Sequence, residues 1–515
     1  MSDFEGRDTY TDAFALDLSN EAASRLLAED IAIVLRTGDM VALSGDLGAG
    51  KTTLARAMLR YLAADDELEV PSPTYTLVQS YETRPKATHF DLYRITVEEE
   101  LTELGFEEAA ETGIVLVEWP ERSRLVEQET NISLHLDTIP AGGRRLVVRA
   151  AAESARRLSR SMAIRRFLET TGRGQARRRP FPADASARRY ERIAPPEGVP
   201  LVLMDSPRLQ RGPVVRDGQT YAEIAHIAQD VLPFVAIGEM LHDAGFSVPQ
   251  IHAADLEDGL VLLEDLGSER IVDADGRPIA ERYVAAAQCL AELHSRAISP
   301  DLQTREGPAY RVPDFDRAAM AIEIDLLPTW FLPRLTGRAA SESEREMFEA
   351  VWERLFDAIE GSEKRLVLRD LHSPNILWQE DRKACRRLGL LDFQDAMIGP
   401  GAYDLASLAQ DARADISPEL EARIVSAYRA ARADEPGFDA FAFEECYAVM
   451  SAQRATKILG IFVRLSERDG KPQYLRHIPR LQAYLKRTLG HPTLAGLKAL
   501  YEDWNILDAP FDGQR

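Results

Sequence analysis

The chain has 515 residues, of which 45% are hydrophobic and 28% charged, and its formal net charge is -22. This length exceeds one hydrophobic core, so about two to four domains are expected. The acidic balance disfavours diffuse binding to nucleic acid or to an anionic membrane, although a local basic patch is compatible with it.

Three features indicate a cytoplasmic protein. The three cysteines, Cys289, Cys385 and Cys446, are far apart and have no metal-ligand spacing, which favours a reducing compartment. The N-terminal segment MSDFEGRDTYTD is acidic and polar, without the apolar core of a signal peptide. No apolar run is long enough to span a membrane, so no membrane association is expected.

The first part of the chain has an α/β pattern. Residues 40–44 (MVALS) and 113–119 (GIVLVEW) are apolar runs typical of buried parallel strands. Residues 132–137 and 145–150 alternate in polarity around a Gly-Gly pair, which predicts a hairpin. We expect one domain over residues 1–153.

An arginine-rich stretch follows at residues 154–182. Its first part, LSRSMAIRRFL, has apolar residues at helical spacing, and GRGQARRRPFP at residues 172–182 is typical of a linker or loop. The stretch therefore predicts a basic helix and a linker. Two interpretations stay open: a solvated helix with a hinge, or a surface that faces RNA or a partner protein.

A different pattern starts at about residue 183. Residues 188–193 and 200–206 predict paired strands of a small lobe that ends near residue 265, and amphipathic helical stretches fill residues 266–515. A small β-rich lobe followed by a large helical lobe is the order of kinase-like proteins. We expect a bilobal α+β domain over residues 183–515.

The motif GDLGAGKTT fits the phosphate-binding loop G-x-x-x-x-G-K-[ST], between an apolar strand and a helix. Its glycines allow backbone N–H groups to surround phosphate oxygens, and the helix N-terminus favours negative charge. Lys51 is expected at the β- and γ-phosphates of ATP, and Thr52 at Mg²⁺. The expected ATP-binding residues of the loop are Gly45, Asp46, Gly48, Ala49, Gly50, Lys51, Thr52 and Thr53.

A phosphate-binding loop also needs a carboxylate for the metal. Asp91, in HFDLYRI, and Glu118, at the end of the apolar run IVLVE, are the candidates. Glu118 follows a predicted parallel strand, and such strand ends face the ligands of open α/β sheets. Either acid could instead be an ordinary surface charge.

Five motifs in order resemble the TsaE family over about residues 16–150: GDLGAGKTT, PSPTYTLVQSY, HFDLYRI, ELGFEE and VEWPER. That family is the ATPase of the machinery that forms N6-threonylcarbamoyladenosine in tRNA. The resemblance implies a P-loop NTPase fold, ATP and Mg²⁺ as cofactors, and the TsaD and TsaB subunits as partners, with an indirect association with tRNA. It places Thr74, Trp119 and, more weakly, Ser24 at the nucleotide, and Glu118 in catalysis and at the metal.

The second constellation is VLRDLHSPNILW followed by LGLLDFQDA. Phosphoryl transfer needs a carboxylate that accepts the proton of the attacking hydroxyl, and an amide and a second carboxylate that hold Mg²⁺ on the phosphates of ATP. Asp370, Asn375 and Asp392 have this order and spacing. His372 could touch phosphate or pack to shape the loop. Asp404 could be catalytic or a buried structural acid.

This region resembles the aminoglycoside-phosphotransferase superfamily. Longer strings, among them DASARRYERI, LMDSP, LLEDLG and DFQDA, look like AmgK, the anomeric kinase of N-acetylmuramate and N-acetylglucosamine in cell-wall recycling. The resemblance covers residue 158 to the C-terminus. It implies an amino-sugar acceptor and a connector near Glu264 and Asp265 that meets the adenine of ATP.

Two residues depart from the superfamily pattern. Leu368 replaces the first histidine of the catalytic loop, and Met204 stands where a phosphate-binding lysine is usual, although AmgK-like sequences share this LMD string. Arg188 or Arg189 could neutralise phosphate charge instead.

We therefore expect a P-loop ATPase fused to an anomeric sugar kinase. Two alternatives stay open for the second half. One is a kinase with another acceptor, such as an aminoglycoside or an amino alcohol. The other is a non-catalytic, nucleotide-sensing pseudokinase. The oligomeric state and any coupling between the two halves are not readable from the sequence.

Overall fold

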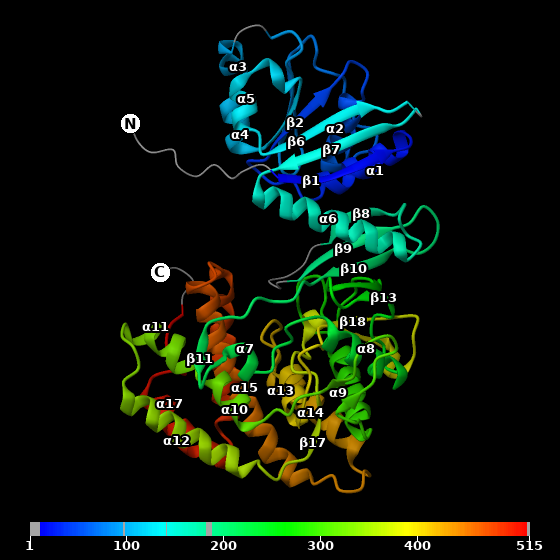
Figure 1. The fold of residues 1–515 in the computed structure, drawn as a ribbon. Coiled ribbons are helices and arrows are strands. Elements are labelled where there is room, and N and C mark those ends of the chain that lie inside the picture. Colours follow the sequence, from blue (N-terminus) through cyan, green and yellow to red (C-terminus); the bar gives the residue numbers. More distant parts are fainter. Residues whose placement is uncertain (1–10, 96–97, 141, 182–187, 512–515) are drawn as a thin grey trace. The chain divides into compact units, whose positions relative to one another are not determined.

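The computed structural model describes residues 11–95, 98–140, 142–181 and 188–511 (Figure 1). The chain folds into two compact units, Met1–Asp205 and Ser206–Arg515. The predicted domain boundary near residue 183 stays a prediction. Within the described part of the chain, no helix is both long and apolar enough to cross a membrane.

The first unit alternates strands and helices, as its sequence pattern predicts. In chain order its elements are β1 (Thr11–Leu18), α1 (Glu21–Ala32), β2 (Met40–Gly45), α2 (Lys51–Ala63), β3 (Val78–Tyr81), β4 (Ala87–Asp91), α3 (Glu99–Glu103), α4 (Phe106–Thr112), β5 (Ile114–Glu118), α5 (Arg124–Glu129), β6 (Ile132–Thr138), β7 (Arg144–Ala150), α6 (Ala152–Thr170), β8 (Arg177–Phe181), β9 (Arg189–Ala194) and β10 (Leu201–Asp205).

A seven-stranded sheet, in the order β1-β7-β6-β2-β5-β4-β3, organises this unit. Strand β2 pairs in parallel with β5 and β6, whereas β1, β7 and β6 pair antiparallel. Alternate residues of β5 enter two separate cores: Leu116 packs with α1 and α2, whereas Val115 and Val117 pack with Phe106 of α4. Burial on both faces explains the continuous apolar runs of these strands.

Local chemistry determines where the helices start. Asn20 caps α1, because its side-chain oxygen accepts a hydrogen bond from the Ala23 backbone N–H at 2.9 Å. Helix α2 starts directly after the phosphate-binding loop. Gly45 is required at the start of that loop, since its φ is +128° and a Cβ there would lie 2.2 Å from the Leu136 carbonyl oxygen.

The arginine-rich stretch differs from its expectation. Residues 172–182, predicted as a linker, contain strand β8, which pairs antiparallel with β9. Arg178 of β8 is 2% exposed, and its guanidinium binds Glu191 at 2.7 Å and Asp30 at 3.0 Å. On α6, which is predicted correctly as a helix, Arg165 binds the buried Asp30 at 2.6 Å. Distant acids neutralise these arginines, so they are not a solvated hinge.

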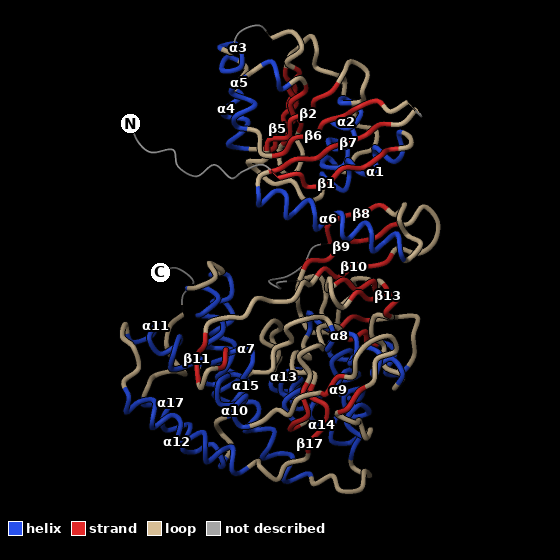
Figure 2. Tube along the Cα trace, viewed as in Figure 1, coloured by secondary structure: helices blue, strands red, loops and turns tan. Residues whose placement is uncertain are grey.

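The second unit is mainly helical (Figure 2). Its helices and strands are β11 (Val214–Arg216), β12 (Gln219–Thr220), α7 (Tyr221–Ile224), α8 (Leu232–Asp243), β13 (Ile251–Asp255), β14 (Leu260–Glu264), α9 (Ala280–Ser295), β15 (Asp301–Leu302), β16 (Tyr310–Arg311), α10 (Arg317–Ile324), α11 (Leu332–Thr336), α12 (Glu342–Ala358), β17 (Lys364–Val367), β18 (Ile376–Trp378), β19 (Leu388–Leu390), β20 (Met397–Pro400), α13 (Ala402–Ala409), α14 (Pro418–Arg432), α15 (Ala440–Glu467), α16 (Ile478–Thr488) and α17 (Ala495–Asp503).

Two short antiparallel pairs in this unit hold the predicted catalytic segments. Strand β17 pairs with β20, and β18 pairs with β19. The segment between β17 and β18 carries Asp370 and Asn375, and Asp392 follows β19 directly. The pairing of β18 with β19 therefore brings together groups that are separated in sequence.

Candidate active sites

Lys51 lies at the start of α2 and points back over the phosphate-binding loop. Its Nζ donates to the backbone oxygens of Gly45 at 2.7 Å and Asp46 at 3.0 Å, and lies 3.6 Å from the centre of the Trp119 ring. Burial lowers the pKa of Lys51, and the carboxylates of Glu118 and Glu121 oppose this only in part. Carbonyl oxygens and an aromatic face thus surround an ammonium group that is expected to bind phosphate.

Glu118 connects the loop to the neighbouring strand. Its Oε2 accepts a hydrogen bond from the Thr52 hydroxyl at 2.9 Å, and its Oε1 lies 3.1 Å from Nε2 of His89. Glu118 is the last residue of β5, and His89 lies within β4; both are buried. Two contacts, one on each oxygen, fix the carboxylate beside the Thr52 hydroxyl. Hydroxyl and carboxylate oxygens are ligands that Mg²⁺ accepts, and the metal role of Thr52 and Glu118 stays a prediction.

Asp91 forms a separate hydrogen-bonded cluster. Its Oδ2 accepts hydrogen bonds from Thr74 at 2.7 Å and Ser72 at 2.9 Å, and its Oδ1 accepts one from the Tyr93 backbone N–H at 3.0 Å. This geometry anchors the SPTYTLV segment to the end of β4. The predicted metal role of Asp91 and the predicted nucleotide contact of Thr74 stay predictions.

Trp119 has a left-handed backbone, with φ of +62°. Such a conformation costs a non-glycine residue roughly 1–2 kcal/mol, and residues of this kind cluster at functional sites. The backbone brings the indole ring against Lys51 and within 5.1 Å of the Tyr93 ring centre. The ring thus lies beside Lys51 of the phosphate-binding motif, and the predicted contact of Trp119 with the nucleotide stays a prediction.

The sequence analysis missed two residues of this site. Arg144, at the start of β7, donates from Nε to the Ala49 oxygen at 2.8 Å and from Nη2 to the Gly48 oxygen at 3.3 Å, and so braces the loop. His89 orients Glu118. Only the position of His89, two residues before Asp91, could have indicated this role, since alternate residues of a strand share a face.

Ser24, which the resemblance places at the nucleotide, lies on α1. Its hydroxyl donates to the Asn20 backbone oxygen at 3.2 Å.

In the second unit, the catalytic loop and the segment after β19 meet at Asn375. Its Nδ2 donates to the backbone oxygen of Asp370 at 3.0 Å and lies 3.4 Å from Oδ2 of Asp392. Asp392 has φ of +57°, and its Oδ1 accepts a hydrogen bond from Gln394 at 2.9 Å. The structure therefore brings together the three residues that the spacing singled out.

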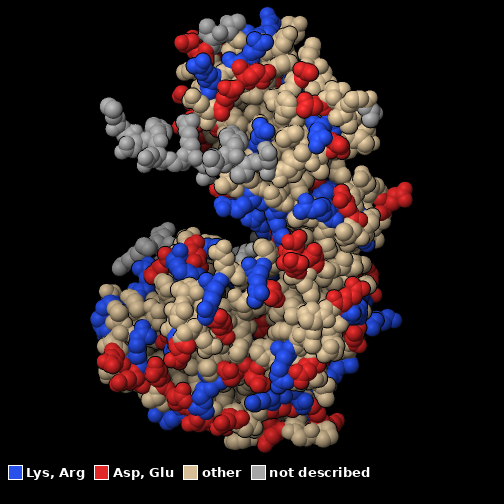
Figure 3. All heavy atoms as spheres, in the orientation of Figure 1, with Lys and Arg blue, Asp and Glu red and all other residues tan. Residues whose placement is uncertain are grey.

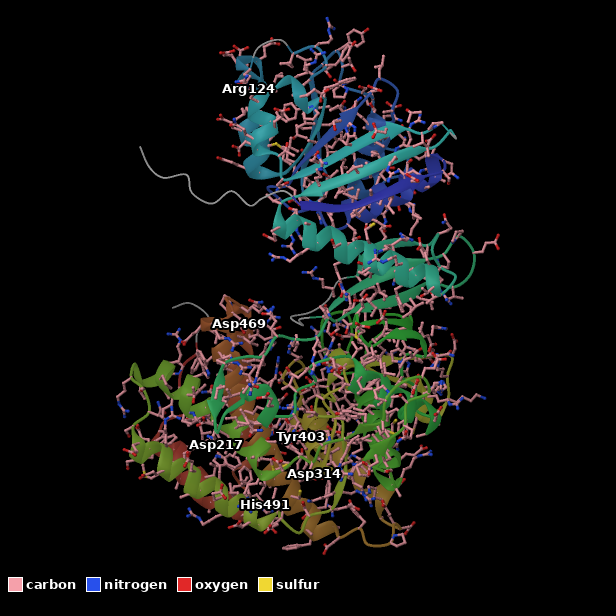
Figure 4. The ribbon with its side chains drawn as sticks, viewed as in Figure 1. Arg124, Asp217, Asp314, Tyr403, Asp469 and His491 are labelled. Atoms are coloured by element: carbon pink, nitrogen blue, oxygen red, sulfur yellow. The ribbon has the colours of Figure 1, made fainter. Side chains whose placement is uncertain are left out.

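Positive groups surround Asp370. Burial alone would raise the pKa of this carboxyl, but the charges of Lys457 and Arg369 outweigh burial, and the pKa is lowered. Lys457 donates to Tyr403 at 3.1 Å and pairs with the buried Glu323 at 2.7 Å; Tyr403 is labelled on α13 in Figure 4. Asp370 is thus ionised at neutral pH and able to accept a proton.

Asp404 of α13 holds the start of the catalytic loop. Its carboxylate accepts hydrogen bonds from the backbone N–H groups of Leu368 at 2.5 Å and Arg369 at 2.9 Å. Burial raises its pKa to about 7, against the effect of these two bonds. The carboxylate thereby supports the loop through the backbone at Leu368, where the superfamily usually has a histidine. Of the two roles that the sequence left open for Asp404, these contacts favour the structural one.

Replacing Asp404 with asparagine should change how stability depends on pH. The pKa of Asp404 is about 7 in the folded protein, above the ordinary value of 3.8. The folded state therefore binds this proton more tightly than the unfolded state does. The wild type loses stability as pH rises from the ordinary pKa to the folded one. Asparagine does not titrate. The stability advantage of the wild type over Asp404→Asn should therefore shrink by roughly 2–3 kcal/mol between about pH 5 and about pH 8.

Urea unfolding followed by circular dichroism at several pH values measures this difference. Asp314→Asn is the matched control, because Asp314 is exposed; it is labelled in Figure 4. A stability difference between wild type and Asp404→Asn that stayed constant with pH would contradict the assignment.

The other predicted residues of the kinase half lie as follows. Burial lowers the pKa of His372, so the ring is neutral and 3.9 Å from Asp411, a position that shapes the loop. The Glu264 side chain binds Arg382 at 2.6 Å at the end of β14. Met204 is fully buried in β10. Arg188 lines a cavity of the first unit, and its predicted contact with ATP stays a prediction.

Comparison with known proteins identifies both parts. A family model described as "Threonylcarbamoyl adenosine biosynthesis protein TsaE" matches residues 18–146, and one described as "Phosphotransferase enzyme family" matches residues 177–441. The N-acetylmuramate/N-acetylglucosamine kinase of Caulobacter vibrioides is 35% identical over 65% of this chain and 94% of that protein. The TsaE protein of Rickettsia prowazekii is 41% identical over 20% of this chain and 72% of that protein.

These matches confirm the predicted fold class, a P-loop α/β domain followed by a kinase-like α+β domain, and both families use ATP. The order of the two matches along the chain is also the predicted one. The chain is a fusion that belongs to the TsaE family in its N-terminal part and to the phosphotransferase enzyme family in its C-terminal part.

Proposed function

We propose that this protein has two ATP-dependent activities. The N-terminal half hydrolyses ATP in support of N6-threonylcarbamoyladenosine formation in tRNA. The C-terminal half transfers the γ-phosphate of ATP to the anomeric hydroxyl of N-acetylmuramate or N-acetylglucosamine. The observation that carries the proposal is the presence of two separate sets of residues, one in each unit: Lys51 with Thr52 and Glu118, and Asp370 with Asn375 and Asp392.

In the kinase half, Asp370 accepts the proton of the attacking sugar hydroxyl. Its lowered pKa keeps it ionised, and an anomeric hydroxyl is more acidic than an ordinary alcohol, so a carboxylate is a sufficient base. Asn375 and Asp392 carry amide and carboxylate oxygens, which are the ligands that Mg²⁺ prefers. These two side chains would hold the Mg²⁺ ion. Bound Mg²⁺ would neutralise charge on the phosphates of ATP.

In the ATPase half, Lys51 binds the phosphates, and Thr52 with Glu118 would hold a second Mg²⁺. The names of the TsaE relatives support a role in tRNA threonylcarbamoyladenosine biosynthesis. The partners in that role would be the TsaD and TsaB subunits, with an indirect association with tRNA. A cytoplasmic location fits this role, and the three cysteines are free thiols, as in a reducing compartment.

A panel of acceptors with ATP labelled in its γ-phosphate tests the kinase half. Label should pass to N-acetylmuramate and N-acetylglucosamine, because Asp370 needs an acidic hydroxyl. It should not pass to the methyl glycosides of these sugars, which lack the anomeric hydroxyl and are otherwise matched. Transfer to kanamycin or ethanolamine instead would favour the kinase with another acceptor. ATP binding without transfer to any acceptor would favour the pseudokinase.

A further inference from the structure

A cavity of about 380 Å³ lies within the first unit, away from the phosphate-binding loop residues. Three segments of the chain line it: residues 33–36 after α1, residues 157–164 of α6, and residues of strands β8, β9 and β10. A volume of this size suits a small ligand, since ligand pockets usually span roughly 300–1,000 Å³.

Both families contribute to this cavity. Residues 33–36 fall within the TsaE match at 18–146, whereas the lining residues from 178 to 205 fall within the phosphotransferase match at 177–441. Helix α6 lies between the two matches. The cavity therefore depends on the fusion, because neither family region alone supplies all of its walls.

Arginines dominate the polar lining. Six arginines and two carboxylates line the cavity, and Figure 3 shows Lys and Arg side chains gathered over α6. Two of the arginines belong to the walls: Arg157 binds Asp39 at 2.7 Å, and Arg178 binds Glu191 at 2.7 Å. These buried pairs hold the walls in place.

The carboxylates of the lining are already engaged. Glu191 binds Arg178, and a single oxygen of Asp205 accepts from Arg160 at 3.0 Å and 2.6 Å. Arg36 makes only an exposed pair with Glu153 at 3.1 Å, with side chains 51% and 65% exposed, a type that contributes little. Arg189 is exposed on β9. Arg36 and Arg189 are thus lining arginines with guanidinium groups on exposed side chains.

The rest of the lining is apolar and includes Val34, Leu35, Ile164 and Phe181. A lining that combines apolar side chains with guanidinium groups suits a ligand that carries both a phosphate and a ring. Guanidinium groups bind phosphate through paired, charge-assisted hydrogen bonds. A hollow of this volume suits a small molecule better than an RNA duplex, which would need a long open surface.

We infer that this cavity is a binding site for a small phosphate monoester, either a sugar phosphate or a mononucleotide, and that its lining is distinct from the phosphate-binding loop and from Asp370, Asn375 and Asp392. The ligand would bridge the TsaE-derived and the phosphotransferase-derived walls and would stabilise the first unit by mass action.

Calorimetric titration of the full chain tests this inference, with both nucleotide sites saturated by ADP and Mg²⁺. The probes are glucose 6-phosphate, AMP and inorganic phosphate, with glucose as the uncharged control. At least one ester should bind at one site per chain, and glucose should not. The double variant Arg36→Gln/Arg189→Gln should weaken this binding by roughly tenfold or more, since it removes two charge-assisted contacts. Preference for either ester identifies the source of the phosphate.

The matched control is Arg124→Gln/Arg145→Gln, which makes the same charge change at exposed residues of the same unit outside the cavity; Arg124 is labelled in Figure 4. It should bind the ester as the wild type does. Absence of saturable binding of all three probes would overturn the inference, as would an equal loss in both double variants. A third result would also overturn the inference: the wild type binds tRNA but no ester, and Arg36→Gln/Arg189→Gln loses the tRNA binding. The arginines would then be assigned to RNA.

Discussion

Replacing Asp370 with asparagine should abolish sugar phosphorylation. Asparagine has nearly the same shape but cannot accept the proton of the attacking hydroxyl, and loss of a general base typically costs 10²–10⁴-fold in rate. We expect kcat to fall by roughly 10³-fold, while KM for the sugar changes little. The measurement is transfer of labelled γ-phosphate to N-acetylglucosamine under saturating ATP.

Asp381→Asn is the matched control, because Asp381 is exposed in the loop after β18 and the change is chemically identical. It should leave the rate unchanged. Circular dichroism should be the same for the two variants and the wild type, since the backbone contacts of the catalytic loop run through Asp404 rather than through the Asp370 side chain. A substantial rate of sugar phosphorylation in Asp370→Asn would show that another residue is the general base.

Replacing Lys51 with alanine should remove the ATPase activity of the first unit without affecting sugar phosphorylation. The Nζ of Lys51 is the one positive group that the structure places over the phosphate-binding loop from α2, and loss of one such electrostatic contact costs roughly 10²–10³-fold. ATP turnover is best measured in an Asp370→Asn background, so that hydrolysis by the kinase half does not contribute.

Trp119 offers an independent measure of the same site. The Lys51 ammonium lies 3.6 Å from its ring centre, so movement of Lys51 onto a phosphate should change the indole fluorescence when ATP binds. This change should be lost in Lys51→Ala and kept in Lys86→Ala, where the lysine is exposed. Loss of sugar phosphorylation in a folded Lys51→Ala protein would contradict two independent sites.

The arginine-rich stretch shows where sequence patterns were insufficient. Residues 172–182 carry glycine, proline and four arginines, a composition typical of a linker. In the folded protein Arg178 is buried against Asp30 and Glu191, and these partners lie 148 and 13 residues away along the chain. No local pattern reveals such a partner, because a buried charge depends on an acid that the fold brings from elsewhere.

The sequence by itself determined the two motifs that bind or transfer phosphate, the order of the two folds and the candidate residues for each site. These features are local: a loop that wraps phosphate, or a base and metal ligands around one turn, needs particular residues at short spacing. Only the tertiary structure decided that His89 orients Glu118, that Arg144 braces the phosphate-binding loop, and that Asp404 holds the backbone at Leu368. Each of these contacts joins residues at least 29 positions apart, so their geometry depends on strand pairing and helix packing rather than on sequence spacing.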